Sequence, residues 1–241
     1  SNQVSYVLSL SLSFSFSLSN NNNHQSNNHS VKQLMEFLEI SIHNILYARK
    51  IYPLSLFERK QIYRVAVWKS RIPALNTYIS NILSDIQSWI KAKSGTLEKL
   101  CVAMLSPDGV VVERFVFELR MPEPETAMGD SSTLSSSSFS LREREEAQSR
   151  WLEESFRSFI TRLRLVDASL GDLPTGCTFK LFVYSKAHRD DVDEARWSPV
   201  QNKEAVVSSS NRSIKPIRSA VPPNGTLPGF RMQLFVEKGR A

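Results

Sequence analysis

Apolar residues recur at helical spacing in three stretches of the chain. The first runs from Val31 to Tyr52, the second from Pro73 to Ile90, and the third from about Arg142 to Val166. Each stretch has one apolar stripe, which is typical of a helix that packs one face on a core. Pro53 is expected to end the first helix, because proline forces the preceding residue toward extended geometry. Gly95 stands where the second helix should stop.

The clearest strand signal is a hairpin. Leu97–Leu105 and Val110–Leu119 are apolar runs joined by the turn sequence Ser-Pro-Asp-Gly at 106–109. The second run carries bulky residues on both faces, with Val110, Val112 and Val116 on one and Phe115, Phe117 and Leu119 on the other. A strand loaded on both faces is expected at the centre of a sheet that helices cover on one side.

Three further runs, Ile62–Trp68, Cys177–Ser185 and Phe230–Val236, are rich in β-branched and aromatic residues and indicate strands. Three helices beside one antiparallel sheet predict an α+β domain. We expect residues 31–241 to form this domain. Residues 1–30 contain no charged residue and are rich in Ser and Asn, so they are expected to be a disordered tail. Residues 130–140 are expected to form a Ser-rich loop.

Composition and motifs argue against most catalytic chemistry. Two cysteines are too few for a disulfide framework or a four-cysteine zinc site, which favours a reducing compartment. Four histidines leave few ligands for any other metal centre. Gly171 and Gly176 have the glycine spacing of a P-loop, but the lysine is missing and a strand follows. His43 lies beside an apolar helical stripe, and Cys101 and Cys177 lie in expected strands, where they pack as small hydrophobes. No metal or cofactor site is predicted.

The charge pattern does not indicate specific nucleic-acid readout. The net charge is +6, but Lys and Arg are scattered among acidic residues, and Arg59-Lys60 is one of the few short clusters. Binding to another protein is the function that remains. A long Pro- and Ser-rich arm follows Ser185 and ends in a strand. If such an arm closes over a sheet edge, it can hold a peptide as an added strand.

Several segments together resemble a known family. They are Phe37–Tyr63, Pro73–Leu83, Val110–Leu119, Leu173–Val183 and Met232–Glu237. In order and spacing they are similar to the HORMA-domain accessory subunits of DNA polymerase zeta, B-form relatives of the spindle-checkpoint mitotic arrest deficient protein 2. The resemblance covers residues 31–241. The Ser/Asn tail and the Ser-rich loop suggest a plant-type member.

The resemblance implies a nuclear, non-catalytic adaptor without a cofactor. Such an adaptor captures a proline-containing peptide of the polymerase catalytic subunit under a C-terminal seatbelt, here residues 186–241. It bridges that subunit to the C-terminal domain of the scaffold translesion polymerase. No membrane contact is implied, and DNA is reached only through partners. A HORMA homodimer or heterodimer is also implied.

Site residues follow from the resemblance. Tyr78 and Trp197 resemble the peptide-lining tyrosine and the seatbelt tryptophan, although Tyr78 is nearly as well explained as core. The scaffold-polymerase surface corresponds to Ile214, Gln233 and Phe235. The dimerisation surface corresponds to Arg157, Asp167 and Ala168, for which an exposed helix and its end are an equally good interpretation.

Two other functions stay open. A checkpoint or cell-cycle HORMA regulator would sequester a mitotic activator in place of a polymerase subunit. A small-molecule enzyme would depend on His43 or Cys177, and turnover lost on mutating them would reveal it. The residues around Trp197 and Met232–Val236 look nearer the polymerase branch.

Overall fold

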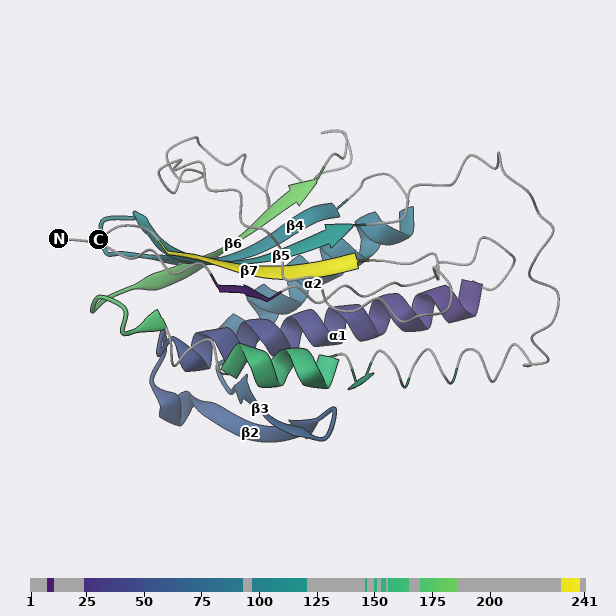
Figure 1. The fold of residues 1–241 in the computed structure, drawn as a ribbon, viewed down its shortest axis with the longest axis horizontal. Coiled ribbons are helices and arrows are strands. Elements are labelled where there is room, and N and C mark those ends of the chain that lie inside the picture. Colours follow the sequence, from purple (N-terminus) through teal and green to yellow (C-terminus); the bar gives the residue numbers. More distant parts are fainter. Residues whose placement is uncertain are drawn as a thin grey trace.

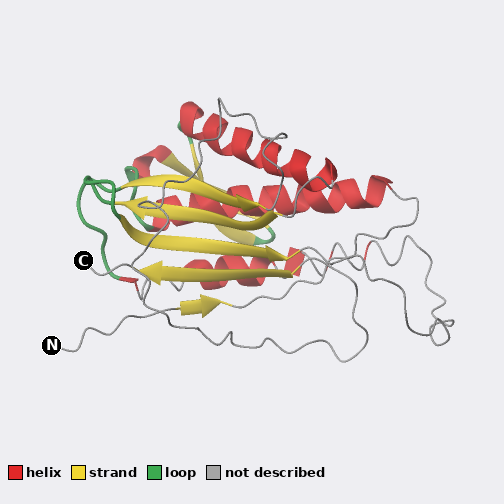
Figure 2. Cartoon of the chain, turned by 90° about the horizontal axis from the view of Figure 1, so that it is seen from above, coloured by secondary structure: helices red, strands yellow, loops and turns green. Residues whose placement is uncertain are grey.

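The computed structural model describes residues 8–10, 24–92, 97–120, 146, 150, 153–154, 156–164, 170–185 and 231–238. Its strands form a five-stranded antiparallel sheet, ordered β1-β7-β5-β4-β6, and a separate two-stranded sheet of β2 and β3. Figure 2 shows the strands of the large sheet side by side, with the short β1 at one edge. The strands are β1 (Leu8–Leu10), β2 (Phe57–Ile62), β3 (Val65–Ser70), β4 (Leu97–Leu105), β5 (Val111–Arg120), β6 (Thr178–Ser185) and β7 (Arg231–Lys238).

The helices lie on one side of the large sheet (Figure 1). They are α1 (His24–Ala48), α2 (Pro73–Ala92) and the helical residues 156–164, which belong to the predicted third helix. Their apolar stripes form one core with the facing side of β4, β5 and β6. Phe37 of α1 stacks on Phe156 with ring centroids 4.2 Å apart, and Phe159 contacts both Phe37 and Phe117 of β5. The predicted α+β architecture is confirmed.

The opposite side of the sheet is apolar as well. A smaller cluster joins alternate residues of the three strands, namely Cys101, Ala103, Leu105, Val111, Val116 and Phe182. β5 therefore contributes to both clusters and occupies the middle of the sheet, as its sequence predicts. One detail differs, because the β4–β5 register shifts between Met104 and Leu105. That irregularity turns Val112 toward the main core and away from the face of Val116.

The β4–β5 turn forms as predicted. Ser106 and Val110 are joined by a backbone hydrogen bond of 2.9 Å, and Gly109 donates its N–H to the carbonyl of Ser106 at 2.9 Å. Gly109 has a φ of +77°, a conformation that glycine adopts without a steric penalty.

The end of α1 differs from the expectation that Pro53 stops it. The helix ends at Ala48, and Lys50 takes a left-handed φ of +53°. Ile51 N–H then bonds to the carbonyl of Leu46, and Lys50 N–H to that of Tyr47. This is the Schellman arrangement, in which a left-handed residue satisfies the last carbonyls of a helix. A lysine rarely fills that position, so the sequence carries no clear stop signal there.

The predicted strand Ile62–Trp68 is wrong as a single element. Residues 57–62 and 65–70 form an antiparallel hairpin, with Ile62 opposite Val65. The two turn residues, Tyr63 and Arg64, both have positive φ, as a two-residue hairpin turn demands. Neither is Gly, Asn or Asp, so nothing in the sequence marks the turn.

Two parts of residues 1–30 differ from the expectation of a disordered tail. Leu8–Leu10 pairs with β7, opposite Leu234–Val236, and α1 begins at His24. The partner strand of the Leu/Ser alternation lies at the far end of the chain, so local sequence could not reveal it. The domain boundary at residue 31 stays a prediction. Within the described ranges, no helix is long and apolar enough to cross a membrane.

Candidate functional site

The outer edge of β6 is a free sheet edge in the described part of the chain. On its inner side β6 pairs with β4 from Thr178 to Ser185. On its outer side no described strand pairs with it, since β6 ends the strand order. A strand edge of this kind presents a row of backbone donors and acceptors to an incoming extended chain.

Aromatic side chains lie beside this edge. Phe179 of β6 makes edge-to-face contacts with Tyr78 of α2 and with Tyr52, at centroid distances of 6.0 and 6.2 Å. Tyr78 is 41% exposed and is one of four exposed large hydrophobic residues in the described chain. An exposed tyrosine beside a free edge is typical of a binding surface, because it combines apolar area with a polar tip.

The hydroxyl of Tyr78 lies close to β6, whose groups influence its pKa. Desolvation raises the pKa of Tyr78, and a hydrogen bond with the backbone of Leu181 in β6 and the charge of Lys180 partly offset that effect. Desolvation also raises the pKa of Tyr52. Both phenols are therefore neutral at physiological pH and can act as hydrogen-bond donors. We call Tyr52, Tyr78, Phe179 and the outer side of β6 the β6-edge site.

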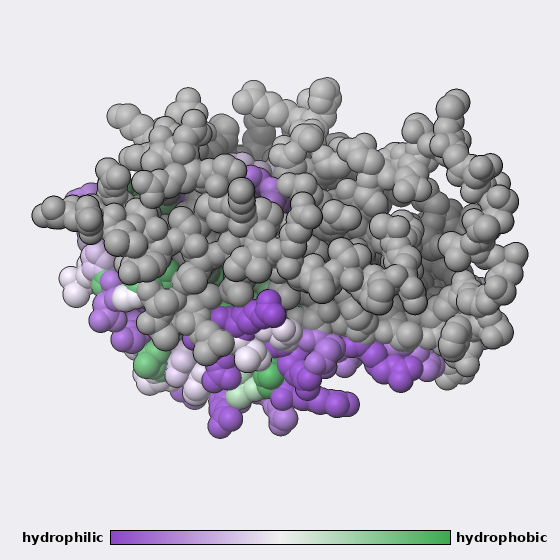
Figure 3. Space-filling view, viewed as in Figure 1, coloured by the Kyte–Doolittle hydropathy of each residue, from purple (hydrophilic) through white to green (hydrophobic). Residues whose placement is uncertain are grey.

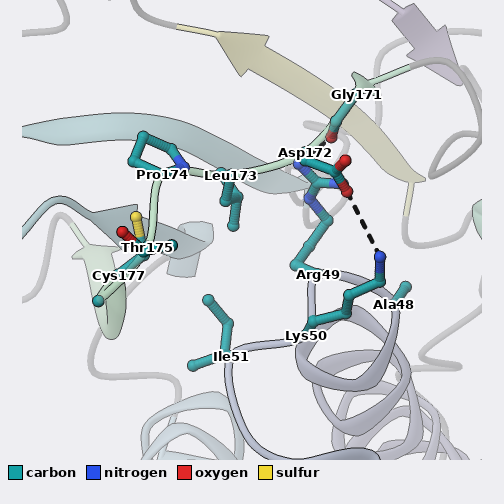
Figure 4. Close-up of a pocket in the computed structure, with 11 residues that line it drawn as sticks. Ala48, Arg49, Lys50, Ile51, Gly171, Asp172, Leu173, Pro174, Thr175 and Cys177 are labelled. Atoms are coloured by element: carbon teal, nitrogen blue, oxygen red, sulfur yellow. Dashed lines mark hydrogen bonds and ion pairs between the residues drawn. The ribbon is translucent and has the colours of Figure 1, made fainter.

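A cavity of about 710 Å³ lies beneath the C-terminal end of α1 (Figure 4). Residues 48–51 form one wall, and residues 171–177, which precede β6, form the other. The stretch with P-loop-like glycine spacing therefore lines a cavity, although it opens no helix. At the cavity mouth, Lys50 and Asp172 form an exposed ion pair of 3.4 Å.

A buried ion pair holds the two walls of this cavity in place. Arg49 donates to both carboxylate oxygens of Glu113 in β5, at 2.8 and 3.1 Å, and to the carbonyl of Gly171 at 2.8 Å. The guanidinium thus links α1, the sheet and the segment leading into β6. Buried charges need such pairing, because removing them from water is costly.

The groups that an enzyme would need here are not activated. Desolvation raises the pKa of Cys177, which favours the thiol over the nucleophilic thiolate. His43 is 1% exposed, and burial lowers its pKa to about 4. Its Nδ1 accepts the N–H of Ser70 at 3.5 Å, so the side chain anchors β3 to α1. No group of three metal-ligating side chains occurs among the described residues.

The predicted site residues are only partly placed. Tyr78 lies at the β6 edge, as described. Gln233 and Phe235 lie in β7, where their backbones pair with Glu118 and Val116 of β5. Arg157 lies on the third helix, partly buried and hydrogen-bonded to Glu154. Four predicted site residues fall outside the described ranges: Trp197, Ile214, Asp167 and Ala168.

Sequence reasoning missed Tyr52, Phe179 and the Arg49–Glu113 pair as elements of the site. Tyr52 precedes Pro53, and Phe179 follows the Thr-Gly-Cys-Thr turn, so both lie in segments that carry the family resemblance. A buried Arg–Glu pair separated by 64 positions leaves no local signal in the sequence.

Comparison with known proteins now identifies the relatives of this fold. A family model described as HORMA domain matches residues 30–214. The Gallus gallus Mitotic spindle assembly checkpoint protein MAD2B is 35% identical over 153 residues, or 64% of each chain. The Arabidopsis thaliana DNA polymerase zeta processivity subunit is 29% identical over 156 residues, which are 65% of this chain and 63% of the relative.

The similarity extends to solved structures. A chain of the Crystal Structure of Mitotic Checkpoint Complex superposes with a TM-score of 0.63 at 21% identity, covering 88% of this chain and 99% of that chain. At that identity the likeness concerns the fold alone. The matched stretches span slightly less than two thirds of the length of the curated relatives.

Proposed function

The chain belongs to the HORMA domain family, and on that premise we propose that it is a non-catalytic adaptor that captures an extended peptide along the outer edge of β6. The observation that carries the proposal is that no strand among the described residues pairs with the outer edge of β6, which has the exposed ring of Tyr78 beside it. Main-chain hydrogen bonds along the edge supply affinity, and the aromatic side chains select what the peptide presents to them.

The topology around β6 supports the same function. β6 ends at Ser185, opposite Leu97, and β7 begins at Arg231, opposite Arg120. Both points lie at the same end of the sheet, on strands separated by β4 and β5, or roughly 14 Å at about 4.8 Å per strand. Residues 186–230, the major part of the predicted seatbelt, lie outside the described residues and connect these two points.

In this proposal the captured peptide is a proline-containing segment of the catalytic subunit of DNA polymerase zeta. Tyr78, and Trp197 in the predicted seatbelt, contact the peptide. Ile214, Gln233 and Phe235 meet the C-terminal domain of the scaffold translesion polymerase, so the adaptor bridges the two polymerases in the nucleus. Arg157, Asp167 and Ala168 form the surface for a second HORMA domain. The name of the Arabidopsis relative supports this assignment.

The checkpoint alternative has its own support, since the chicken relative is named as a spindle checkpoint protein. In that case the same β6-edge site would take a segment of a mitotic activator. Pull-down of the full chain from nuclear extract separates the two. Recovery of polymerase subunits supports the proposal, whereas recovery of a mitotic activator without them overturns it.

Hydrogen–deuterium exchange tests the site directly. A synthetic proline-containing peptide from the polymerase catalytic subunit is added to the full chain. We expect new protection along Thr178–Ser185, because outward backbone groups become paired, and little change along β2 and β3. Unchanged exchange in β6 at a saturating peptide concentration would mean that the β6 edge is not the binding site.

A further inference from the structure

The β2–β3 hairpin and the residues that follow it carry a local excess of positive charge. Residues 57–72 contain five basic residues and one acidic residue, Glu58. The pKa of Glu58 is lowered by its hydrogen bond with Lys60 and by the charges of Lys60, Arg71 and Lys69. In Figure 3, hydrophilic side chains gather along the lower edge of the molecule, where Figure 1 places β2 and β3.

The two lysines of this surface form ion pairs, whereas its arginines form none within the described part of the chain. Lys60 forms an ion pair with Glu58 at 2.8 Å, and Lys69 with Glu39 at 2.9 Å. No salt bridge joins any of four exposed arginines to a carboxylate among the described residues. The four arginines are Arg59 and Arg64 of the hairpin, Arg71 directly after β3, and Arg164 of the third helix.

Contacts within the structure hold Arg164 and Arg71 beside the hairpin. Arg164 Nη1 donates to the carbonyl of Ala66 in β3 at 3.4 Å, and Arg71 donates to the carbonyl of Ser55. Tyr63, at the hairpin tip, packs against Phe156 of the same helix with centroids 5.6 Å apart. Two carboxylates, Glu36 and Glu153, lie near the Tyr63 hydroxyl and raise the pKa of that phenol.

The hairpin tip is also strained. Tyr63 and Arg64 have φ values of 50° and 58°, which cost residues with a side chain of this size free energy. Tyr63 is fixed by its contact with Phe156, whereas the side chain of Arg64 is exposed. Strain of this kind is often retained at functional positions. Here it holds the Arg64 side chain at the far end of the ribbon.

We propose that the β2–β3 ribbon, with Arg59, Arg64, Arg71 and Arg164, binds the phosphate backbone of duplex DNA. Guanidinium groups without carboxylate partners suit phosphate oxygens, which they bind through two parallel hydrogen bonds. Arg59 lies opposite Trp68, and Arg64 lies one residue beyond Val65 at the tip, so at about 3.3 Å per residue the two arginines are roughly 13 Å apart along the ribbon, comparable with about four phosphates of one DNA strand. Contacts of this kind position a protein on DNA without reading its sequence.

This surface is distinct from the β6-edge site, and its proposal does not depend on peptide capture. It belongs to the two-stranded sheet, whereas β6 belongs to the five-stranded one. It departs from the expectation that DNA is reached only through partners. The reason is that folding brings Arg164 next to Ala66, although they are separated by 98 positions in the sequence.

The test is fluorescence anisotropy with a labelled 24-base-pair duplex and the full chain over a range of salt concentrations. The double variant Arg59→Gln with Arg64→Asn removes two charges, and asparagine tolerates the left-handed φ of residue 64. The matched control, Lys32→Gln with Arg150→Gln, removes two exposed charges elsewhere. We expect at least a tenfold loss of affinity for the hairpin variant and a salt slope smaller by about 2. The control should change affinity less than twofold.

Any one of three results would overturn the proposal. The first is that the wild-type chain does not bind the duplex at 50 mM salt, and the second is that the control variant loses as much affinity as the hairpin variant. The third is that a poly-glutamate peptide binds while the duplex does not. Two duplexes of unrelated sequence should bind equally. Peptide capture at the β6 edge should be unchanged in the hairpin variant, which keeps this test separate from that of the proposed function.

Discussion

Arg49 and Glu113 form a two-point ion pair inside the molecule, with side chains 4% and 0% exposed. The same guanidinium reaches a third group, because its Nη2 also donates to the carbonyl of Gly171. The pair therefore connects the end of α1 to the middle of the sheet and to the segment that leads into β6. The position of the β6 edge depends on this connection.

Glu113→Gln should destabilise the fold by about 3 kcal/mol, because it removes the carboxylate charge that pairs with the buried guanidinium of Arg49. Urea unfolding of the full chain measures the change. Asp172→Asn is the matched control, since the Lys50–Asp172 pair is exposed and contributes about 0.5 kcal/mol or less. Equal stability of the two variants would contradict the role assigned to Glu113.

Tyr78→Ala should weaken capture of the polymerase peptide by about tenfold while changing stability by less than about 1 kcal/mol. Tyr78 is 41% exposed, so we expect its removal to cost the core little and to act mainly on peptide binding. Titration calorimetry gives the affinity, and Tyr78→Phe separates the hydroxyl from the ring. Val110→Ala, a change at an exposed hydrophobic residue of the β4–β5 turn, should bind as the wild type does. If Tyr78→Ala also binds normally, Tyr78 has no part in the site.

Stability should depend on pH through His43. Its pKa is about 4 in the folded chain, against an ordinary value of 6.5 for an exposed histidine, so the unfolded chain binds more protons between these values. The free energy of unfolding therefore rises as the pH increases from 4 to 6.5. The contribution of His43 to the free energy of unfolding is fully present above pH 6.5 and amounts to about 3 kcal/mol.

His43→Asn tests this dependence. Asparagine retains an acceptor for the N–H of Ser70 but does not titrate, so the stability of the variant should change less between the two pKa values of His43. Unfolding in urea at several pH values gives the free energy of unfolding against pH for both proteins. The contributions of the carboxylates that the two proteins share cancel in the difference. Parallel curves for the two proteins would show that His43 is not the group responsible.

Two glycines should respond differently to alanine. A Cβ at Gly109 would meet nothing within 4 Å, so only its φ of +77° opposes the change and the loss should be about 1 kcal/mol. A Cβ at Gly176, with φ of +79°, would also lie 3.2 Å from Cγ of Pro107. Gly176→Ala should therefore lower the melting temperature more than Gly109→Ala does. The reverse order would mean that the contact with Pro107 relaxes freely.

Much of the fold could be predicted from local sequence patterns. The helix through Val31, the helix that begins at Pro73 and the hairpin with Gly109 carry strong periodicity and turn chemistry. All three form, although the first helix begins at His24 and ends at Ala48. The turn at Tyr63–Arg64 could not be predicted, because its residues are held by tertiary contacts such as that with Phe156. The pairing of Leu8–Leu10 with β7 depends on a partner near the other end of the chain.

The candidate site residues, like the elements of the fold, could be predicted from the sequence only in part. Tyr78 could be named only through the family resemblance, because its place on a helical stripe equally fits a core residue. Its contact with Phe179 joins elements separated by about a hundred positions, and no local pattern encodes that distance. Arg59, Arg64 and Arg71 lie near one another in the sequence, whereas Arg164 joins them only through folding.

β7 lies between β1 and β5 in the sheet, and its Glu237 lies opposite Arg114 of β5. A ribosome must therefore synthesise more than a hundred further residues after β5 before that central strand acquires its second neighbour. Until then, the nascent chain exposes the unpaired side of β5 to its surroundings. Such non-local closure is slow and prone to aggregation, so production of this protein should benefit from chaperones and low temperature.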